Sequence, residues 1–225
     1  MKKRSKRYQG IKEKIEKKKY SLEEAVKLIK EEKTKFDQGV EVHLRLGIDP
    51  KKGEQLVRGQ VSLPHGTGKT LKIMAFVSPE KEKEARDAGA DIIGDEAKVA
   101  EIKKTGKVDF DIAVAMPDMM KKVAPIAKIL GQKGLMPNPK TGTIGPNVAT
   151  IISELKKGKV TFKNDDSANV HQLVGKVSFD EKQLLGNMQV FIEAVKKAKP
   201  AKSKGTYIKG AVVCTSQGPS IKVNI

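Results

Sequence analysis

The sequence predicts a mixed fold, α/β and α+β, in which a discontinuous α+β domain is built from both termini and an α/β domain is inserted into it. Near both ends, apolar and polar residues alternate, which is typical of strands with one buried face. In the middle, continuous apolar runs alternate with helical patterns, which favours a parallel sheet covered on both faces. We expect residues 1–66 plus 160–225 in the first domain and 67–159 in the second, although tandem domains would give similar patterns.

The amino-terminal part is basic before it becomes periodic. Residues 1–19 contain ten Lys or Arg and little apolar spacing, which predicts a basic arm or a helix that becomes ordered on a partner. Ser21 and Glu24 have the spacing of a capping box, so a helix is expected to follow Ser21. Strict alternation over 40–48 then predicts a half-buried strand with a polar, accessible face, and a second strand is expected over 57–63.

The middle of the chain predicts a doubly wound, Rossmann-like unit. Strands are expected at 71–77, 91–93 and 110–116, and helices at 80–88, 97–104, 119–130 and 148–157. Residues 131–147 hold four glycines, three prolines and two lysines but no acidic residue, a composition that predicts a long cationic loop. Such a loop is either a working surface or a solvated lid.

The carboxyl-terminal part returns to half-exposed strands around one amphipathic helix. The strands are expected at 159–163, 170–179, 207–214 and 220–223, and the helix at 181–197. Residues 215–219 have the composition of a turn between the last two strands.

The charge balance points to a polyanionic partner, with nucleic acid as the first candidate. Lys and Arg number 45 against 27 Asp and Glu, a net charge of +18. The excess is eight in residues 1–66 and five in residues 160–225, so the expected split domain carries most of it. Aromatic residues are only 4% of the chain, which favours phosphate and shape contacts over base stacking.

No signal peptide or membrane span is apparent, so a cytoplasmic protein without membrane contact is expected. The single cysteine, Cys214, excludes a disulfide framework and is expected to pack in a strand. His43, His65 and His171 are far apart and lack metal-ligand spacing.

Nothing else in the sequence calls for catalysis, a cofactor or a metal. Asp109 and Asp111 are expected at the start of a strand, and Asp165 and Asp166 in a turn. Residues 63–70 end like a phosphate-binding loop, but Leu63 stands where that loop requires glycine. A hinge between the domains is the favoured interpretation, formed by Pro64, His65, Gly66, Gly68 and Gly158.

Several stretches resemble one family. Residues 134–143 read GLMPNPKTGT, and the stretches 36–43, 57–69, 168–171, 205–207 and 218–219 agree with the same pattern. They resemble the L1 family of large-subunit ribosomal proteins, which belong to the mobile stalk beside the tRNA exit site. The similarity spans nearly the whole chain.

The resemblance implies a non-enzymatic protein, monomeric outside the ribosome. It implies that the split domain binds large-subunit ribosomal RNA, that the protein assists release of deacylated tRNA from the exit site, and that it represses its own operon mRNA. The family's RNA-contacting positions fall on Phe36, Glu41, Lys163, Gly210, Ser216, Gln217 and Gly218. Two of these depart from the family pattern: Gly210 replaces the usual Ser or Thr, and Gln217 replaces Met.

Two other classes are compatible with composition alone. One is a nucleotide-using α/β enzyme with the loop 131–147 over its pocket, which would be stabilised by ATP or a dinucleotide. The other is a non-specific basic protein, which would not prefer structured RNA to duplex DNA at matched salt.

Overall fold

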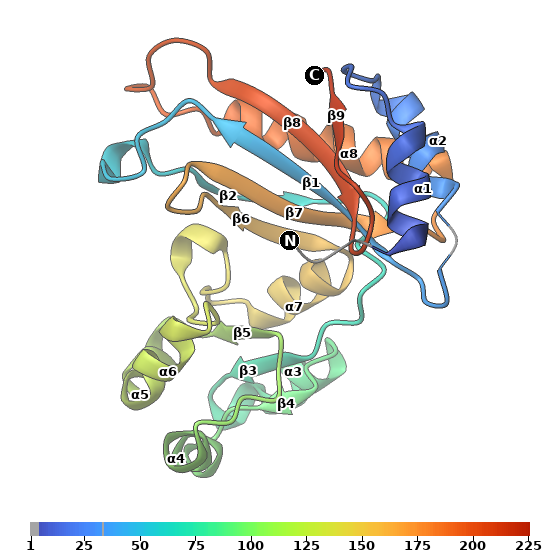
Figure 1. Ribbon diagram of the computed structural model, residues 1–225. Coiled ribbons are helices and arrows are strands. Elements are labelled where there is room, and N and C mark those ends of the chain that lie inside the picture. Colours follow the sequence, from blue (N-terminus) through green and yellow to red (C-terminus); the bar gives the residue numbers. More distant parts are fainter. Residues whose placement is uncertain (1–4, 33) are drawn as a thin grey trace. The chain divides into compact units, whose positions relative to one another are not determined.

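The computed structural model describes residues 5–32 and 34–225. The chain divides into two compact units, Met1–Gly68 with Val160–Ile225, and Lys69–Lys159 (Figure 1). The first crossing between the units comes two residues later than the sequence pattern suggested, after Gly68 rather than Gly66. The two ends of the chain therefore share one unit.

The first unit is built on an antiparallel sheet with the order β7-β1-β8-β9. These strands are β7 (Asn169–Lys176), β1 (Gly39–Leu46), β8 (Ile208–Thr215) and β9 (Ile221–Val223). Strands β2 (Arg58–Ser62) and β6 (Lys159–Lys163) form a separate two-stranded sheet. A single-turn 3₁₀ helix, Gly53–Gln55, lies between β1 and β2.

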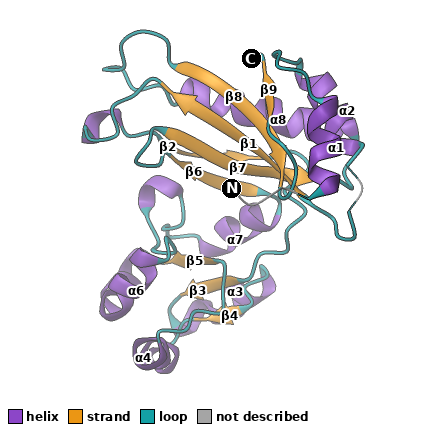
Figure 2. Ribbon diagram, in the orientation of Figure 1, coloured by secondary structure: helices purple, strands orange, loops and turns teal. Residues whose placement is uncertain are grey.

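Helices α2 (Leu22–Lys30) and α8 (Glu181–Lys197) pack together and cover one side of this unit (Figure 2). The alternation in β1 is confirmed, because Val40, Val42, Leu44 and Leu46 are buried in the core while the residues between them are not. The capping box of α2 is also present: the Ser21 hydroxyl accepts from the Glu24 backbone N–H at 3.2 Å. The opposite face of the sheet therefore presents its polar side chains.

The basic amino-terminal segment contains helix α1 (Lys6–Lys14). Ser5 caps it by accepting from the Tyr8 backbone N–H at 3.3 Å. The expected arm also includes residues 1–4, which lie outside the described residues.

The second unit is a parallel sheet with the order β4-β3-β5. Its strands are β3 (Ile73–Phe76), β4 (Ile92–Ile93) and β5 (Ile112–Ala115). Side chains on one face pack with α3 (Glu82–Asp87) and α7 (Val148–Lys156), and those on the other with α4 (Glu96–Thr105), α5 (Met120–Val123) and α6 (Ala127–Gln132). All four residues of β3 are buried because both faces are covered, which confirms the α/β fold class.

Three local expectations need correction. The expected helix 119–130 is a series of short turns, in which the 3₁₀ segments Pro117–Met119 and Ala124–Ile126 flank α5. Pro125 lacks the backbone N–H that a continuous helix requires. The strand expected over 170–179 ends at Lys176, where Phe179 N–H donates back to the Lys176 carbonyl at 3.0 Å. The helix expected over 80–88 begins with the 3₁₀ turn Pro79–Lys81.

The glycine-proline segment 131–147 is mostly loop, as expected, but it is not without structure. Its first two residues belong to α6, and Pro139–Thr141 form a 3₁₀ turn. Ile144 makes a parallel bridge with Ala115 at the free edge of β5, supported by Ala115 N–H donating to the Thr143 carbonyl at 3.0 Å. The loop therefore covers an edge of its own sheet.

Among residues 5–32 and 34–225, none of the helices combines the length and apolar character needed to cross a bilayer.

Candidate nucleic-acid interface

The open face of the four-stranded sheet carries most of the polar groups near the sequence-predicted RNA residues. Antiparallel pairing places the β1 residues Glu41, His43 and Arg45 opposite Cys214, Val212 and Gly210 of β8, and opposite Leu173, His171 and Asn169 of β7. Directly paired residues share a face of the sheet. Glu41 and Gly210 therefore lie on one accessible surface.

The turn between β8 and β9 lies beside the start of β1. Ser216 N–H donates to the Gly39 carbonyl at 3.1 Å, and Gly39 N–H donates to the Ser216 hydroxyl at 3.2 Å. Phe36, three residues earlier, has an exposed fraction of 49%, unusual for a large apolar side chain. The structure thus brings together five predicted residues: Phe36, Glu41, Ser216, Gln217 and Gly218.

A buried polar group holds this turn from below. Glu32 is 4% exposed, and its carboxylate accepts from the Thr215 hydroxyl at 2.5 Å and from the Gln38 side-chain amide at 3.4 Å. The Gln38 side-chain oxygen, Oε1, accepts from Gln217 N–H at 2.9 Å. Because Glu32, Gln38 and Thr215 satisfy one another and the turn, the backbone of 215–218 is fixed in the absence of a ligand.

Gly218 is required by this arrangement. A Cβ placed on it would approach the Thr215 hydroxyl within 2.2 Å and the two Glu32 carboxylate oxygens within 2.3 and 2.5 Å. The resemblance placed Gly218 among the RNA-contacting positions. The structure adds that the space on the protein side is already filled by the buried Glu32.

Gly210 and Lys163 lie elsewhere in the unit. Gly210 is in β8 opposite Arg45 and lines a hollow whose cationic walls are Lys19, Arg45, Lys209 and Lys222. A Cβ on Gly210 would meet nothing within 4 Å, so the loss of the usual hydroxyl is not imposed by space. Lys163 is exposed on β6, in the separate two-stranded sheet.

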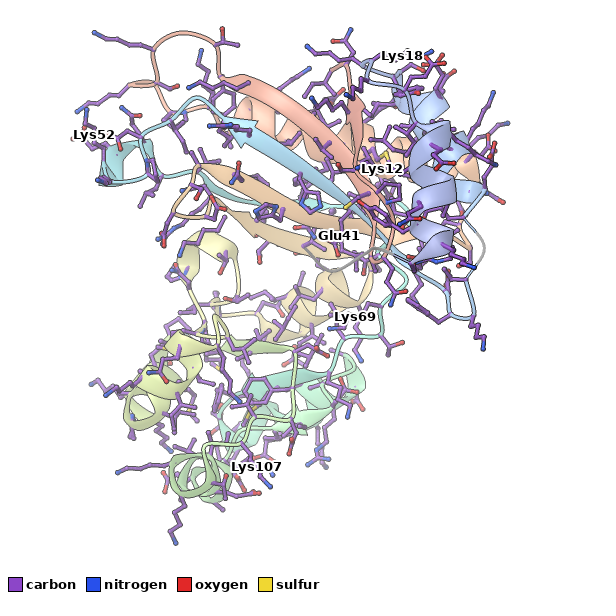
Figure 3. The ribbon with its side chains drawn as sticks, in the orientation of Figure 1. Lys12, Lys18, Glu41, Lys52, Lys69 and Lys107 are labelled. Atoms are coloured by element: carbon purple, nitrogen blue, oxygen red, sulfur yellow. The ribbon has the colours of Figure 1, made fainter. Side chains whose placement is uncertain are left out.

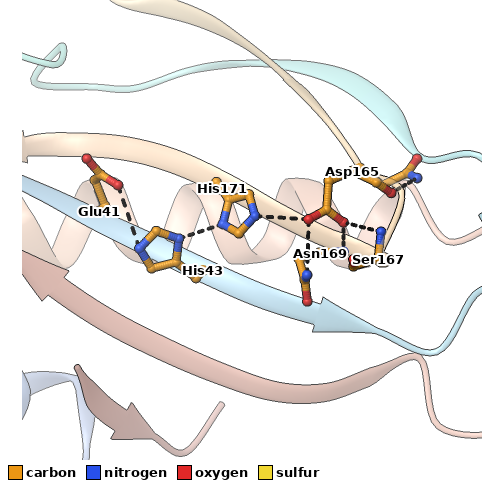
Figure 4. A network of polar contacts seen from close by, with 7 residues as sticks. Glu41, His43, Asp165, Ser167, Asn169 and His171 are labelled. Atoms are coloured by element: carbon orange, nitrogen blue, oxygen red, sulfur yellow. Dashed lines mark hydrogen bonds and ion pairs between the residues drawn. The ribbon is translucent and has the colours of Figure 1, made fainter. Parts of the chain in front are cut away.

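Two histidines that sequence spacing kept apart are in fact in contact, so that expectation was wrong. The Nδ1 atoms of His43 and His171 lie 2.6 Å apart, because pairing of β1 with β7 places the two residues opposite each other. A row of polar contacts runs through this pair from Glu41 to Asp165 (Figure 4). His65 is not part of it.

The two histidines lie within hydrogen-bonding distance of each other and of their neighbours. His171 Nε2 lies 3.3 Å from the Asp165 carboxylate, which can only accept, so this nitrogen is the donor. His43 Nε2 lies 3.1 Å from the Cys214 sulfur and 3.6 Å from the Glu41 carboxylate. Burial, followed by the charge of His171, lowers the pKa of His43, and the nearby Glu41 opposes this shift.

Two other groups in the row have shifted pKa values. Donation from the Asn169 backbone N–H is the first cause that lowers the pKa of Asp165 to about 2, and this carboxylate also accepts from Ser167 N–H. The turn expected around Asp165 is therefore present. Burial raises the pKa of the Cys214 thiol to about 11, as suits a packed thiol. In the described ranges, no group of three or more His, Cys, Asp or Glu side chains has a geometry that could hold a metal ion.

Two of the predicted hinge residues are held by hydrogen bonds to α8, and three of them are glycines with left-handed backbone angles. The buried Asn187 of α8 accepts from His65 N–H at 3.2 Å and donates to the Gly66 carbonyl at 2.8 Å. Gly66, Gly68 and Gly158 all have positive φ, at 63°, 69° and 104°, which favours glycine. Pro64 precedes the anchored pair, and Gly158 follows α7.

Sequence reasoning missed the residues that support the interface. Glu32 and Gln38 look like ordinary polar residues, and Arg7 is one cation among many. Yet the Arg7 guanidinium donates to the Gln217 carbonyl at 3.1 Å. The capping box of Ser21 and Glu24 lies at the opposite end of α2 from Glu32. No periodic signal marks contacts between residues this far apart.

Comparison with known proteins gives a consistent result. The profile of the Ribosomal protein L1p/L10e family matches residues 28–219. The chain is 50% identical over 226 residues to a protein of Mycolicibacterium vanbaalenii, covering all of this chain and 96% of the relative. It is 47% identical to proteins of Solibacter usitatus (97% of this chain, 93% of the relative) and Fervidobacterium nodosum (100% and 97%).

All three relatives are named large ribosomal subunit protein uL1. The match covers both units of the chain, and it includes both the turn 215–218 and the segment 36–41 that lies beside it. This chain therefore belongs to the Ribosomal protein L1p/L10e family.

Proposed function

We propose that this chain is a structural protein of the large ribosomal subunit and that its first unit binds large-subunit ribosomal RNA. The contact surface comprises the turn Ser216–Gly218, Phe36 and Glu41, and it extends along the open face to Gly210. Lys163 contributes from β6. The family is non-enzymatic, so the nucleotide-using enzyme considered from composition is set aside.

The observation that carries the proposal is the pre-ordered turn beside an exposed aromatic ring. Exposed Ser216 and Gln217 stand on a backbone held by the buried Glu32, while Phe36 offers an apolar face. A surface ordered before binding loses little conformational entropy on binding. The Ser216 hydroxyl suits a ribose 2′-hydroxyl, and Phe36 suits a sugar or base.

Charge supports an RNA partner more generally. Lysine side chains project from both units, as Lys52 and Lys107 show (Figure 3). The hollow beside Gly210 is lined by four cationic side chains and no acidic side chain. Each phosphate neutralised by such a group releases counterions, so the affinity is expected to fall steeply with salt. Glu41 is the exception on this surface and is suited to accept from a 2′-hydroxyl or an exocyclic amine.

A binding experiment tests the proposal. A transcript of the stalk region of large-subunit ribosomal RNA and a duplex DNA of equal length are titrated with the protein over a KCl series. We expect the RNA to bind more tightly by at least about tenfold at matched salt. Ser216→Ala should weaken RNA binding by about fivefold, the loss of one hydrogen bond. Because the same hydroxyl accepts from Gly39 N–H, the melting temperature should fall by no more than about a few degrees. Equal affinity for RNA and DNA would leave only a non-specific basic protein.

The finer functions form part of the same proposal. We propose that the protein assists release of deacylated tRNA from the exit site, represses its own operon mRNA by binding a similar RNA structure, and is monomeric outside the ribosome. The connections between the units serve as the hinge. Because Asn187 anchors His65 and Gly66, bending is expected at Gly68 and Gly158 rather than at Pro64.

A further inference from the structure

A pocket next to the turn is lined by Arg7, Thr34, Lys35, Phe36 and Gln217. It joins the amino-terminal helix α1 to two residues of the RNA surface, and none of its lining residues is acidic. The Thr34 hydroxyl donates to the Phe36 carbonyl at 2.6 Å, which holds the backbone that carries the exposed ring. The pocket therefore combines two cations with an accessible aromatic side chain.

Of the two terminal nitrogens of the Arg7 guanidinium, Nη2 has a hydrogen-bond partner among the described residues and Nη1 has none there. Its Nη2 donates to the Gln217 carbonyl at 3.1 Å and lies 3.5 Å from the Gln217 side-chain oxygen. Its Nη1 is shielded from solvent and has no hydrogen-bond partner in the described part of the chain. An arginine keeps its charge at any physiological pH, so an unsatisfied N–H of this group is unfavourable. A small rotation of the side chain toward an acceptor in the pocket would relieve it.

The chemistry of the pocket matches one nucleotide of RNA. A phosphate or base carbonyl oxygen would satisfy Arg7 Nη1, a base or ribose would pack on Phe36, and Lys35 at the rim would add attraction to the backbone. Gln217, at the position where the family pattern has Met, contributes both of its oxygens to holding Arg7. Gln217, which departs from the family pattern, thus has a hydrogen-bonding partner in α1.

We propose that Arg7 is a further RNA-contacting residue and that this pocket receives a single nucleotide against Phe36. The inference rests on the proposed function and adds to it a residue from the amino-terminal helix. The basic segment is then part of the interface rather than a solvated arm.

The test compares two charge-removing variants of the same helix, Arg7→Gln and Lys12→Gln. Lys12 also lies in α1 but does not line the pocket. With the stalk-region transcript, Arg7→Gln should weaken binding by about tenfold and lower the salt slope by about one. Lys12→Gln should change affinity by about twofold or less, the effect of one exposed charge. Arg7→Lys, which keeps the charge but loses the fork, should fall between them.

A double variant tests whether Arg7 and Phe36 contact the same nucleotide. Phe36→Leu alone should weaken binding by about tenfold through loss of stacking. Combined with Arg7→Gln, the loss should be smaller than the product of the two single effects. Melting temperatures within a few degrees of the parent protein, about the effect of 1 kcal/mol or less, would show that the variants are folded.

The outcomes separate this inference from the function on which it rests. Failure of the parent protein to prefer the RNA would remove the proposed function. If the parent protein binds but Arg7→Gln behaves like Lys12→Gln, Arg7 does not contact the RNA and the pocket receives no nucleotide. A loss of affinity in Arg7→Gln with an unchanged salt slope would show that Arg7 only braces the turn, which would also overturn the inference. If the affinity losses of the two single variants simply multiply in the double variant, Arg7 remains an RNA contact. The proposal that Arg7 and Phe36 contact the same nucleotide would then be overturned.

Discussion

Two glycines of the proposed RNA surface occupy very different surroundings: Gly210 lies near the start of strand β8, and Gly218 lies in the turn that follows its end. Gly218 lies over Thr215 and the buried Glu32 carboxylate, with no room for a Cβ. Gly210 lies beside a cationic hollow with nothing within 4 Å of the position of its Cβ. One end of the surface is therefore determined by packing within the protein, whereas the other is free to vary.

The difference shows that a residue can match the family pattern because of contacts within the protein rather than contacts with RNA. Gly218 matches the family pattern, and the structure supplies an intramolecular reason for it. Gly210 departs from the pattern, and the structure shows no steric obstacle to the usual side chain. Variants at the two positions can therefore separate folding effects from binding effects.

The largest effect is expected for Gly218→Val. The added side chain must displace Thr215 or Glu32, and overpacking of this kind costs about 1–3 kcal/mol of unfolding free energy. The displaced turn should also weaken RNA binding by more than about tenfold. Urea unfolding and RNA titration measure the two effects, with Gly210→Val as the matched control. If Gly210→Val lost as much stability as Gly218→Val, the proposed difference in packing around the two glycines would be wrong.

An intermediate effect is expected from pH, through the histidine pair between the two ends. The pKa of His43 is lowered in the folded protein, chiefly by burial and then by His171, so the unfolded chain takes up the proton first as pH falls. This contribution to stability is present above the ordinary histidine pKa of 6.5 and is lost as pH falls below it. Cys214, Glu41 and Asp165 also belong to the row, but the Cys214 and Asp165 pKa values of about 11 and about 2 lie outside this window.

Melting temperatures on either side of pH 6.5 measure this effect. We expect a lower melting temperature on the acid side, because the pKa of His43 is lowered in the folded protein. In His171→Asn the neighbouring charge is removed, so the pH dependence should become shallower. A steeper dependence in this variant would contradict the assignment of the pair.

The smallest effect is expected for Gly210→Ser, which restores the hydroxyl of the family pattern. Because the site is open, the free energy of unfolding should change by less than about 0.5 kcal/mol. RNA affinity should be unchanged or improve by up to about fivefold, the contribution of one hydrogen bond. A marked loss of affinity would show that RNA backbone occupies this space and requires the glycine.

Local signals in the sequence were sufficient for most elements. The alternation of β1, the capping box of α2 and the continuous apolar run of β3 each depend on residues a few positions apart, and each is confirmed. The expected helix over 119–130 failed because Pro125 outweighed an otherwise helical pattern. The assignment of residues 131–147 to loop missed the bridge at Ile144, since an isolated bridge has no periodicity to detect.

The candidate site shows the same division. The family resemblance located seven residues along the chain, and five of these lie together in the structure around one turn. Glu32, Gln38 and Arg7 were not found, because their partners are far away in sequence and any polar residue could stand at such positions. Likewise, His43 and His171 are 128 residues apart and meet only through the register of β1 and β7.

The sequence by itself determined the fold class, the basic character, the family resemblance and most helix and strand positions, because these follow from patterns over short distances and from composition. The tertiary structure alone decided which polar groups lie beneath the turn, which histidines contact each other and where the amino-terminal helix docks. These contacts depend on strand register and side-chain burial, which bring distant residues within hydrogen-bonding distance.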